Sequence, residues 1–535
     1  MGETADPVGH VGRFVARHFP TIQAPGVVIG LTSRDGPLGV VTEGHADLAG
    51  REPVRPAHLL QIGSISKSFT AIAVLQEQAA GRLDLGAPVT EYLPWFNVRS
   101  PSEPVTVHHL LTHTSGLPTG RDFTGEAMHE LLALRESGVG FTPGTRFHYS
   151  NAGYKALGLV LEAVTGRPWW ELVQARVLDP LGMGATEPIT TPEGRSRSAI
   201  GHVPAFDDRP RHPRDRLVPA PWIESATADG TICSTAEDMC AYIRMLLSEG
   251  APLLSEQSFA LLVQAATEDP DAPGEFYGYG LKTTTVEGRK YIGHTGSTVG
   301  FSAWMEMDPG PGVGIIALSN ADANLGVTAR FSLRTLSAWF SGEPLPDVPD
   351  PTPVDRVDGA ADYAGIYRSE HGELTLVAEG ERLILANRGE PVALVRQKGD
   401  RFVVAHPEFE RFPLSFEREG GDVTILTNGD RWWGNDRYVG DATFDRPNGW
   451  EAVSGHWRSH NPWYSNFRIM PRRGSLRFLW GWGEEDWELD PLPGGGFRVG
   501  AEEWLPRRIR FDTVIDGRAT RAVLDGAPYY RTFTP

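Results

Sequence analysis

The spacing of hydrophobic and polar positions changes partway along this chain and divides it into two parts. In the first part, apolar positions recur at helical spacing over residues 8–19, which predicts an amphipathic opening helix. The uninterrupted apolar run 26–31 predicts a buried strand, and the turn signal Asp35-Gly36 predicts a hairpin to a second strand near 39–45. A longer helix is expected from Ser64 to about residue 80, where Gly81 ends it.

Short strand-like runs follow at 278–281, 290–293, 301–307 and 314–319, and residues 330–340 predict a closing helix. The pattern therefore indicates an α+β domain over residues 1–341. We expect a mainly antiparallel sheet flanked by terminal helices, with a helical subdomain between about residues 65 and 250.

Five prolines between residues 344 and 353 make 342–356 a stiff, extended linker. After it, short alternating runs are separated by tight turns. The run Gly365-Ile366-Tyr367-Arg368-Ser369 returns as Gly455-His456-Trp457-Arg458-Ser459. This repeat predicts two small antiparallel β-barrels, at 357–447 and 448–535.

Composition narrows the class of protein. The chain has 535 residues and a net charge of −18, which disfavours nucleic acid and anionic membranes as partners. Its first residues show no basic and apolar leader, and no apolar stretch is long enough for a membrane span, so a cytoplasmic protein is expected. Cys233 and Cys240 lack zinc-binding spacing, so we expect reduced thiols and no metal.

Candidate chemistry begins at Ser64-Ile65-Ser66-Lys67. Serine and lysine three positions apart on a helix share one face, which brings a nucleophile close to a candidate base. Exposed lysine is charged at neutral pH, but the apolar residues after Lys67 indicate a buried helix, and burial lowers the pKa of a lysine. A serine that merely caps the helix is the alternative if this motif stands alone.

Two further motifs follow. Tyr149-Ser150-Asn151 comes after a turn, where a phenol can relay a proton and an amide can hold a substrate carbonyl. His294-Thr295-Gly296-Ser297 follows a strand, and Gly296 allows close approach of a ligand to the backbone. The backbone N–H groups of Ser64 and Ser297 are candidates for an oxyanion hole, and His294 is expected to be partly protonated near neutrality.

The order S-x-x-K, Y-x-N, H-x-G resembles the serine beta-lactamase and penicillin-binding superfamily, in its class C-like peptidase and esterase branch, over about residues 8–340. Leu110–Leu117 and Ser234–Met239 resemble structural stretches of that branch. The resemblance implies that Ser64 is acylated, that Lys67 and Tyr149 share the role of base, and that Asn151 contacts the substrate amide. His294 stands where many relatives have lysine, which favours amide, amine-bearing or ester substrates over carboxylates.

A beta-lactamase/transpeptidase-like domain followed by two lipocalin-like barrels resembles the bacterial D-aminopeptidases of this superfamily. In these enzymes a loop of the last barrel helps to bind the free amine of the substrate. By this resemblance Glu484, Glu485 and Asp486 are candidate partners of an ammonium group, although three acidic residues in a row also fit a solvated turn. Two-barrel relatives also imply a homodimer.

The sequence therefore predicts a serine hydrolase that acts without a cofactor on amide or ester bonds of small substrates containing D-amino acids. Three alternatives keep the acyl-enzyme: an acyltransferase that cyclises nonribosomal peptides, a broad carboxylesterase, and a D,D-carboxypeptidase. A non-catalytic ligand-binding protein on the same fold is the remaining alternative. Substrate side chain and stereochemistry are left open by the sequence.

Overall fold

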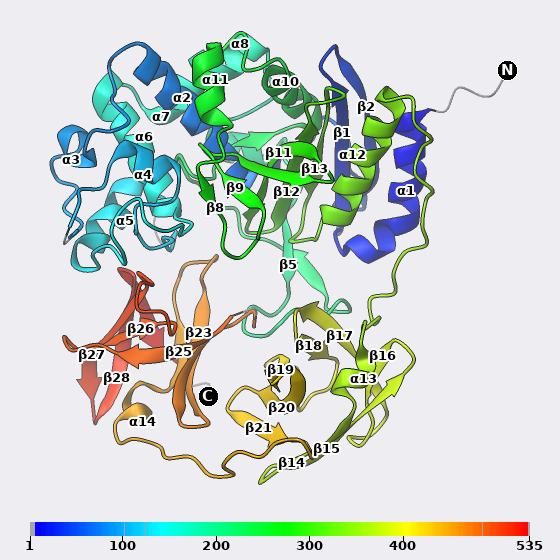
Figure 1. The fold of residues 1–535 in the computed structure, drawn as a ribbon, viewed down its shortest axis with the longest axis vertical. Coiled ribbons are helices and arrows are strands. Elements are labelled where there is room, and N and C mark those ends of the chain that lie inside the picture. Colours follow the sequence, from blue (N-terminus) through cyan, green and yellow to red (C-terminus); the bar gives the residue numbers. More distant parts are fainter. Residues whose placement is uncertain (1–5, 101, 123–124, 484, 533–535) are drawn as a thin grey trace. The chain divides into compact units, whose positions relative to one another are not determined.

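The structure is a computed structural model that describes residues 6–100, 102–122, 125–483 and 485–532 (Figure 1). Its chain forms two compact units, which are described separately. The first contains the residues up to Val203 together with Val218–Pro351, and the second contains Pro204–Leu217 and Thr352–Pro535. The second unit is therefore built from two separate stretches of sequence.

The first unit is organised around a nine-stranded sheet of antiparallel pairs, in the order β3-β2-β1-β13-β12-β11-β10-β9-β8. The strands are β1 (Gly26–Ser33), β2 (Pro37–Asp47), β3 (Glu52–Pro53), β8 (Thr267–Glu268), β9 (Glu275–Tyr277), β10 (Lys282–Val286), β11 (Arg289–Thr298), β12 (Phe301–Asp308) and β13 (Val313–Ser319). Two short pairs stand apart from it, β4 (Leu60–Gln61) with β7 (Cys233–Ser234) and β5 (His202–Pro204) with β6 (Leu217–Pro219).

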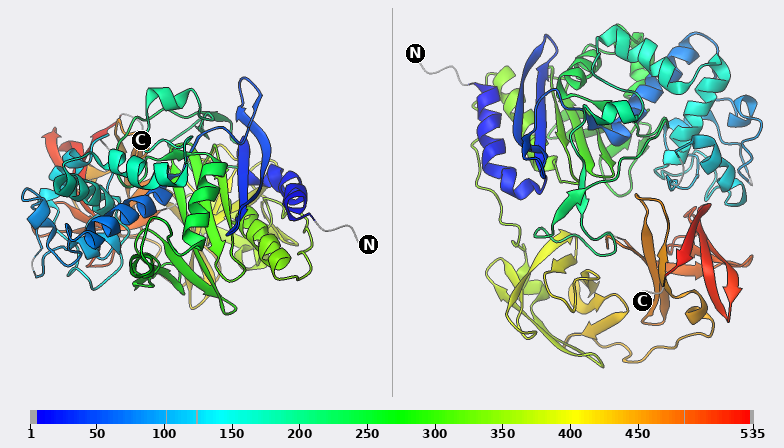
Figure 2. Two further views of the ribbon diagram at one scale, coloured as in Figure 1. Left: turned by 90° about the horizontal axis from the view of Figure 1, so that it is seen from above. Right: turned by 180° about the vertical axis from the view of Figure 1, so that it is seen from behind.

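Alternate residues of the central strands face two different hydrophobic cores, as strand geometry requires. In β1, Val27 and Ile29 pack with the terminal helices α1 (Pro7–Ile22) and α12 (Gly326–Phe340), whereas Val28 packs in the larger core with α2 (Ser66–Ala79) and α10 (Ala236–Leu247). The dark-blue α1 and the yellow-green α12 lie side by side in Figures 1 and 2. The predicted α+β layers are thus confirmed.

A helical subdomain packs around α2, which is buried along most of its length. Its helix α6 starts at Asn151 because the Ser150 side chain accepts a hydrogen bond from the Gly153 N–H, and it ends at Gly166 in the left-handed region (φ 68°). The remaining helical segments of the first unit are η1 (Gly63–Ile65), α3 (Val89–Tyr92), α4 (Val107–Leu111), α5 (Ala127–Ala133), η2 (Leu134–Glu136), α6 (Asn151–Thr165), α7 (Trp169–Val173), η3 (Gln174–Leu178), α8 (Asp179–Leu181), α9 (Pro192–Arg195) and α11 (Glu256–Leu262).

One predicted strand is wrong. Residues 278–281 form the turn between β9 and β10, closed by a hydrogen bond of 2.8 Å from the Gly278 N–H to the Leu281 carbonyl. Gly280 has φ 72°, which strand residues do not adopt, and a Cβ there would lie 2.7 Å from the backbone of Lys67. The turn therefore sits directly against the first turn of α2.

The second unit contains the two predicted barrels, each closed by eight antiparallel strands. The first barrel follows α13 (Ala360–Tyr363) and consists of β14 (Gly365–Ser369), β15 (Gly372–Glu379), β16 (Arg382–Leu385), β17 (Val392–Lys398), β18 (Arg401–Val404), β19 (Leu414–Glu419), β20 (Asp422–Asn428) and β21 (Arg431–Gly434). The second follows α14 (Trp450–Val453) and consists of β22 (Gly455–Arg458), β23 (Asn466–Arg472), β24 (Ser475–Trp480), β25 (Asp486–Pro491), β26 (Phe497–Val499), β27 (Arg508–Ile515), β28 (Arg518–Leu524) and β29 (Ala527–Arg531).

The sequence repeat has a structural counterpart at the start of each barrel. Tyr367 and Trp457 occupy the same place in the repeat, and both are fully buried. The Tyr367 hydroxyl donates to the carbonyl of Tyr363 (2.9 Å), and the Trp457 indole N–H donates to the carbonyl of Val453 (3.1 Å). In both barrels, one aromatic side chain therefore fastens the first strand to the short helix four residues earlier.

The segment 204–217, which interrupts the first unit in sequence, is bonded to both barrels. Arg209 forms an ion pair with Glu410 of the first barrel, with 2.5 Å between Nη1 and Oε1. On the second barrel, Arg458 pairs with Asp207, and the Asn466 amide donates to the Asp207 carbonyl (2.8 Å). The hydrophobic pattern did not indicate this insertion.

Among the described helices, none has the length and apolar character required to cross a bilayer.

Candidate active site

Ser64 lies in the 3₁₀ turn η1, which connects β4 to α2 and is pressed against β11. Gly63 adopts φ 52°, and a Cβ on it would lie 2.7 Å from the Ser297 nitrogen. A Cβ on Gly296 would lie 1.9 Å from the Ile62 carbonyl oxygen and 3.1 Å from the Ser64 nitrogen. Glycine at both positions lets the two backbones meet, which brings the N–H groups of Ser64 and Ser297 into one small region.

Lys67 lies one turn beyond Ser64 and contacts it directly. Its Nζ donates to Ser64 Oγ over 2.9 Å and to the backbone carbonyl of Asp229 over 2.8 Å. The lysine is 0% exposed, whereas Ser64 is partly exposed. Burial lowers the pKa of Lys67 from 10.5 to about 8, although the carboxylates of Asp229 and Asp122 oppose the change. A useful fraction of the amine is therefore neutral near pH 7 and able to accept the Ser64 proton.

Tyr149 completes the immediate surroundings of this pair. The Lys67 Nζ lies 5.0 Å from the centroid of the Tyr149 ring. Burial raises the pKa of Tyr149, and a hydrogen bond with Ser64 only partly offsets this effect. The phenol is therefore protonated at neutral pH, so it is suited to donate or pass on a proton rather than to act as a phenolate base.

The loop that carries Tyr149 is fixed by His113, in the stretch Leu110–Leu117 that the sequence analysis interpreted as structural. His113 Nδ1 accepts a hydrogen bond from the Ser150 N–H (3.1 Å), and its carbonyl accepts one from the His148 N–H (2.8 Å). The imidazole packs against the Tyr149 ring at a tilt of 40°, with 4.2 Å between ring centroids. Burial lowers the pKa of His113 well below its usual value, so the ring is a neutral support for this loop.

Asn151 is the first residue of α6, and its backbone N–H donates to the Thr119 carbonyl (2.7 Å). Its side-chain Oδ1 is buried without a hydrogen-bond partner among the described residues. An orphaned buried acceptor costs free energy, so this oxygen is available for a donor group of a ligand.

A buried ion cluster lies behind these groups. Lys155 on α6 is 1% exposed and pairs with the carboxylates of Asp122 and Glu130, and Glu130 also accepts hydrogen bonds from backbone N–H groups. Asp122 and Lys155 both influence the pKa of Lys67, in opposite directions. The cluster therefore fixes the charge environment of the candidate base.

The predicted partial charge of His294 is wrong. Its side chain is 4% exposed, and burial together with the nearby cations Lys282 and Lys67 lowers the pKa of His294 to about 3. Because the Thr295 carbonyl only accepts, Nδ1 must be the donor of the bond between them (2.5 Å), which leaves Nε2 to accept from the Tyr277 hydroxyl (3.1 Å). His294 is thus a neutral imidazole with both nitrogens occupied.

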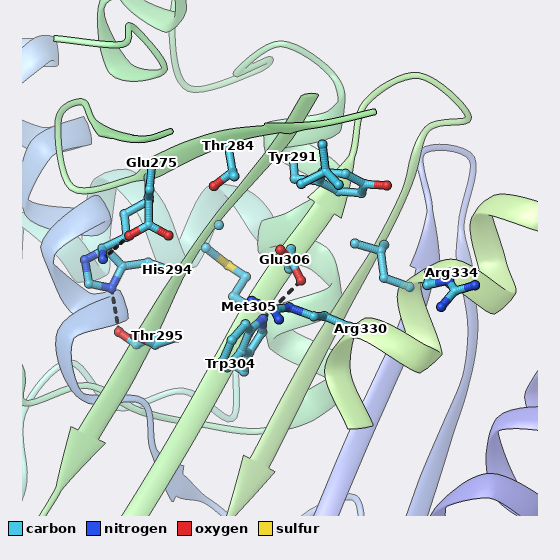
Figure 3. Close-up of a pocket in the computed structure, with 14 residues that line it drawn as sticks. Glu275, Thr284, Tyr291, His294, Thr295, Trp304, Met305, Glu306, Arg330 and Arg334 are labelled. Carbon is cyan, nitrogen blue, oxygen red and sulfur yellow. Dashed lines mark hydrogen bonds and ion pairs between the residues drawn. The ribbon is translucent and has the colours of Figure 1, made fainter. Parts of the chain in front are cut away.

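His294 and the next motif residue, Thr295, line a cavity of about 360 Å³ on the sheet (Figure 3). The charged lining residues come from β9, β10, β12 and α12, namely Glu275, Lys282, Glu306, Arg330 and Arg334. Lys282 forms ion pairs with Glu275 and Asp269. The positive charge of Lys282, which lies near His294, is therefore already balanced by two carboxylates.

The three acidic candidates of the last barrel are placed differently. Glu484 lies outside the described residues. Glu485 has its Oε2 3.7 Å from an Arg507 nitrogen. Asp486 is held by two guanidinium groups of its own barrel, those of Arg472 (2.6 Å) and Arg477 (2.9 Å). Since its charge is already paired, Asp486 is not part of the function proposed below.

The sequence analysis missed Asp229, as it missed the ion cluster of Lys155, Asp122 and Glu130. Asp229 lies just before the stretch Ser234–Met239, and its backbone contacts Lys67. The sequence indicates Asp229 only weakly, because a single aspartate in Ala228-Asp229-Gly230 matches no known motif of catalytic or metal-binding residues.

A serine, a buried lysine of lowered pKa and a protonated tyrosine in mutual contact, beside a sheet, define a serine hydrolase of the beta-lactamase fold. Comparison with known proteins agrees with this class. The beta-lactamase family model matches residues 14–335. The chain therefore belongs to the beta-lactamase family.

Three relatives illustrate the range of that family. The chain is 30% identical over 364 residues to penicillin-binding protein 4 of Amycolatopsis lactamdurans, covering 63% of this chain and 92% of that protein. It is 28% identical over 289 residues to a D-aminopeptidase of Cereibacter sphaeroides (strain KD131 / KCTC 12085), covering 52% and 54% of the two chains. The crystal structure of a D-stereospecific amidohydrolase from Streptomyces sp. superimposes with a TM-score of 0.51 at 26% identity, over 63% of this chain and 99% of that one.

Proposed function

We propose that this protein hydrolyses amide or ester bonds of small substrates that contain D-amino acids, through an acyl-enzyme on Ser64. The observation that carries the proposal is the neutral, fully bonded His294 in the third motif. A cation at that place would attract a substrate with a free carboxylate beside the scissile bond, and a neutral imidazole does not. Neutral amide and ester substrates do not require a cation there.

In the proposed reaction, neutral Lys67 accepts the proton of Ser64 as Oγ attacks the substrate carbonyl carbon. The negative charge that develops on the carbonyl oxygen is stabilised by the backbone N–H groups of Ser64 and Ser297. When the carbon–nitrogen or carbon–oxygen bond breaks, the leaving group takes a proton that Tyr149 passes on from Lys67. Water then attacks the ester on Ser64, releases the acid and restores the hydroxyl.

The substrate class has support beyond His294. A D-aminopeptidase and a D-stereospecific amidohydrolase are among the proteins that this chain resembles. The two closed barrels after the catalytic unit match the layout from which D-aminopeptidase activity was predicted. The homodimer and the cytoplasmic location expected from sequence belong to the same proposal, and light scattering after gel filtration tests the former.

The direct test is hydrolysis of matched D-alanyl and L-alanyl p-nitroanilides by the wild type and by Ser64→Ala. Cleavage of the D form that is lost in Ser64→Ala is expected. Turnover that survives this substitution contradicts the assignment of Ser64. Failure to cleave either anilide, with p-nitrophenyl acetate still hydrolysed, would favour the esterase alternative.

A second assay distinguishes hydrolysis from acyl transfer. With a linear peptidyl thioester, a hydrolase releases the linear acid, whereas the alternative peptide cyclase releases a cyclic product. Mass spectrometry separates the two, since they differ by one water.

A further inference from the structure

The side chain of Asp229 is a buried carboxylate without full compensation. The residue is 5% exposed, and its Oδ1 has no hydrogen-bond partner among the described residues. Burying a carboxylate oxygen without a donor is costly, and proteins normally pair such an atom. Asp229 Oδ1 can therefore accept a hydrogen bond from a donor group of a bound ligand.

The position of Asp229 is fixed by its neighbours along α2. Thr70 donates to the carbonyl of Ala228 (2.6 Å), Lys67 donates to that of Asp229 (2.8 Å), and the Ile232 N–H donates to Ser66 (3.2 Å). These three contacts hold the segment against the first turns of the helix. The backbone that carries the carboxylate is therefore fixed in place.

This segment also borders Ser64. A single Lys67 Nζ contacts Ser64 Oγ and the Asp229 carbonyl, so the two residues lie on either side of one nitrogen atom. A Cβ on Gly230 would lie 3.8 Å from the backbone of Gly63, the residue before Ser64. The backbone of Asp229 therefore lies beside the Ser64–Lys67 pair, and its carboxylate is one side chain away from it.

The negative charge of Asp229 is least compensated when Lys67 is neutral, which is the state that can accept the Ser64 proton. The carboxylate interacts with the Lys67 ammonium. Lys67 must be neutral before it can accept the Ser64 proton. The carboxylate then loses this counter-charge but keeps its interaction with the Lys155 ammonium. A positive group on the substrate would restore the balance.

We propose that Asp229 binds the ammonium group of an amine-bearing substrate, with Asn151 Oδ1 as a further acceptor. An ammonium has three donors, and both residues carry a buried oxygen without a partner among the described residues. Asp229 contacts Lys67 through its backbone, and Asn151 belongs to the second motif of the site. The inference rests on the proposed function and narrows its substrates to those with a free amine. It places amine recognition in the catalytic unit instead of at residues 484–486 of the last barrel.

A bound ammonium also favours the reactive state. Two cations beside one carboxylate repel each other, so a substrate ammonium drives Lys67 toward its neutral form. An amine-bearing substrate therefore helps to activate the base that attacks it, whereas an acylated substrate does not.

Calorimetric titration of the Ser64→Ala protein tests the proposal without turnover. The probes are D-alaninamide, mostly cationic at about pH 7, and N-acetyl-D-alaninamide, which is neutral. In the Ser64→Ala background, Asp229→Asn is expected to lower the affinity for D-alaninamide at least ~10-fold, which is about 1.4 kcal/mol of binding free energy. Binding of the acetylated probe should be unchanged. Asp35→Asn, the same chemical change at an exposed turn, should leave both affinities unchanged.

Several results would overturn the proposal. These are equal weakening of both probes by Asp229→Asn, no effect on either, and no binding of D-alaninamide to the parent protein at millimolar concentration. Loss of D-alaninamide binding in Glu485→Gln but not in Asp229→Asn would move the amine site to the last barrel. Labelling of Ser64 by a fluorophosphonate in the Asp229→Asn single variant shows that the site is still folded.

Turnover separates this inference from the proposed function. If the protein binds D-alaninamide through Asp229 but leaves D-alanyl p-nitroanilide uncleaved, the hydrolase proposal fails and the ammonium site stands. If the anilide is cleaved and Asp229→Asn lowers its rate no more than that of p-nitrophenyl acetate, the hydrolase stands and the ammonium site fails.

Discussion

The lowered pKa of Lys67 gives the sharpest prediction. A change from 10.5 to about 8 corresponds to roughly 3 kcal/mol in favour of the neutral amine. At pH 7 about 9% of the lysine is then neutral, against about 0.03% for an exposed lysine, a gain of roughly 300-fold in the reactive form. Because the neutral form is the base, acylation of Ser64 should rise with pH up to about 8 and then level off.

The assay is the rate of Ser64 labelling by an uncharged fluorophosphonate from about pH 5.5 to 9.5. This probe has no titratable group, so the profile belongs to the enzyme. Lys67→Arg keeps a permanent cation at this position and should both slow labelling at least ~100-fold and remove the rise. A rise centred near pH 6.5 would implicate a histidine, and a flat profile would refute the role of Lys67 altogether.

Three other outcomes are expected. Gly296→Ala should slow labelling more than ~100-fold because its Cβ collides with the turn before Ser64, whereas Gly36→Ala, which meets no atom within 4 Å, should behave as wild type. His294→Ala should lower the free energy of unfolding by about 1–3 kcal/mol, since it leaves buried hydrogen-bonding groups unpaired, as urea denaturation would show; an unchanged midpoint would contradict the bonding described. Lys155→Met should cost about 3–5 kcal/mol in the same assay by leaving two carboxylates unpaired, while Arg167→Ala, at an exposed ion pair, should cost less than about 1 kcal/mol.

Local sequence patterns predicted much of the fold, because the periodicity of a helix or strand and the residues of a turn depend on neighbours in sequence. The periodic residues of α1, the buried run of β1 and the turn signals of the barrels reappear at nearly the predicted positions. The failure at 278–281 has a clear cause. The run Gly278-Tyr279-Gly280-Leu281 alternates like a strand, but Gly280 takes a left-handed conformation to approach α2. That approach depends on a helix two hundred residues earlier in sequence.

In the candidate site, too, local sequence predicts some features, whereas others depend on residues that are distant in sequence. The contact of Ser64 with Lys67 follows from helical spacing, and the approach of β11 follows from Gly296. The charge of His294 does not follow from its neighbours in sequence, because it depends on burial and on Lys282 across the sheet. Asp229 likewise gains its significance from a lysine far away in sequence, so no local pattern could reveal it.

The insertion 204–217 means that a segment from the first half of the sequence belongs to the same compact unit as the two barrels near its end. Its ion pairs with both barrels, and the hydrogen bond that the Asn466 amide donates to it, do not depend on the proline-rich connection at 342–356. A protease that cuts this connection would therefore nick the chain without releasing the barrels, and the two fragments should copurify until a denaturant separates them. A gene truncated at this connection would encode the catalytic unit without the barrels. The charged side chains of 204–217 would then lack the partners that they have in the full chain.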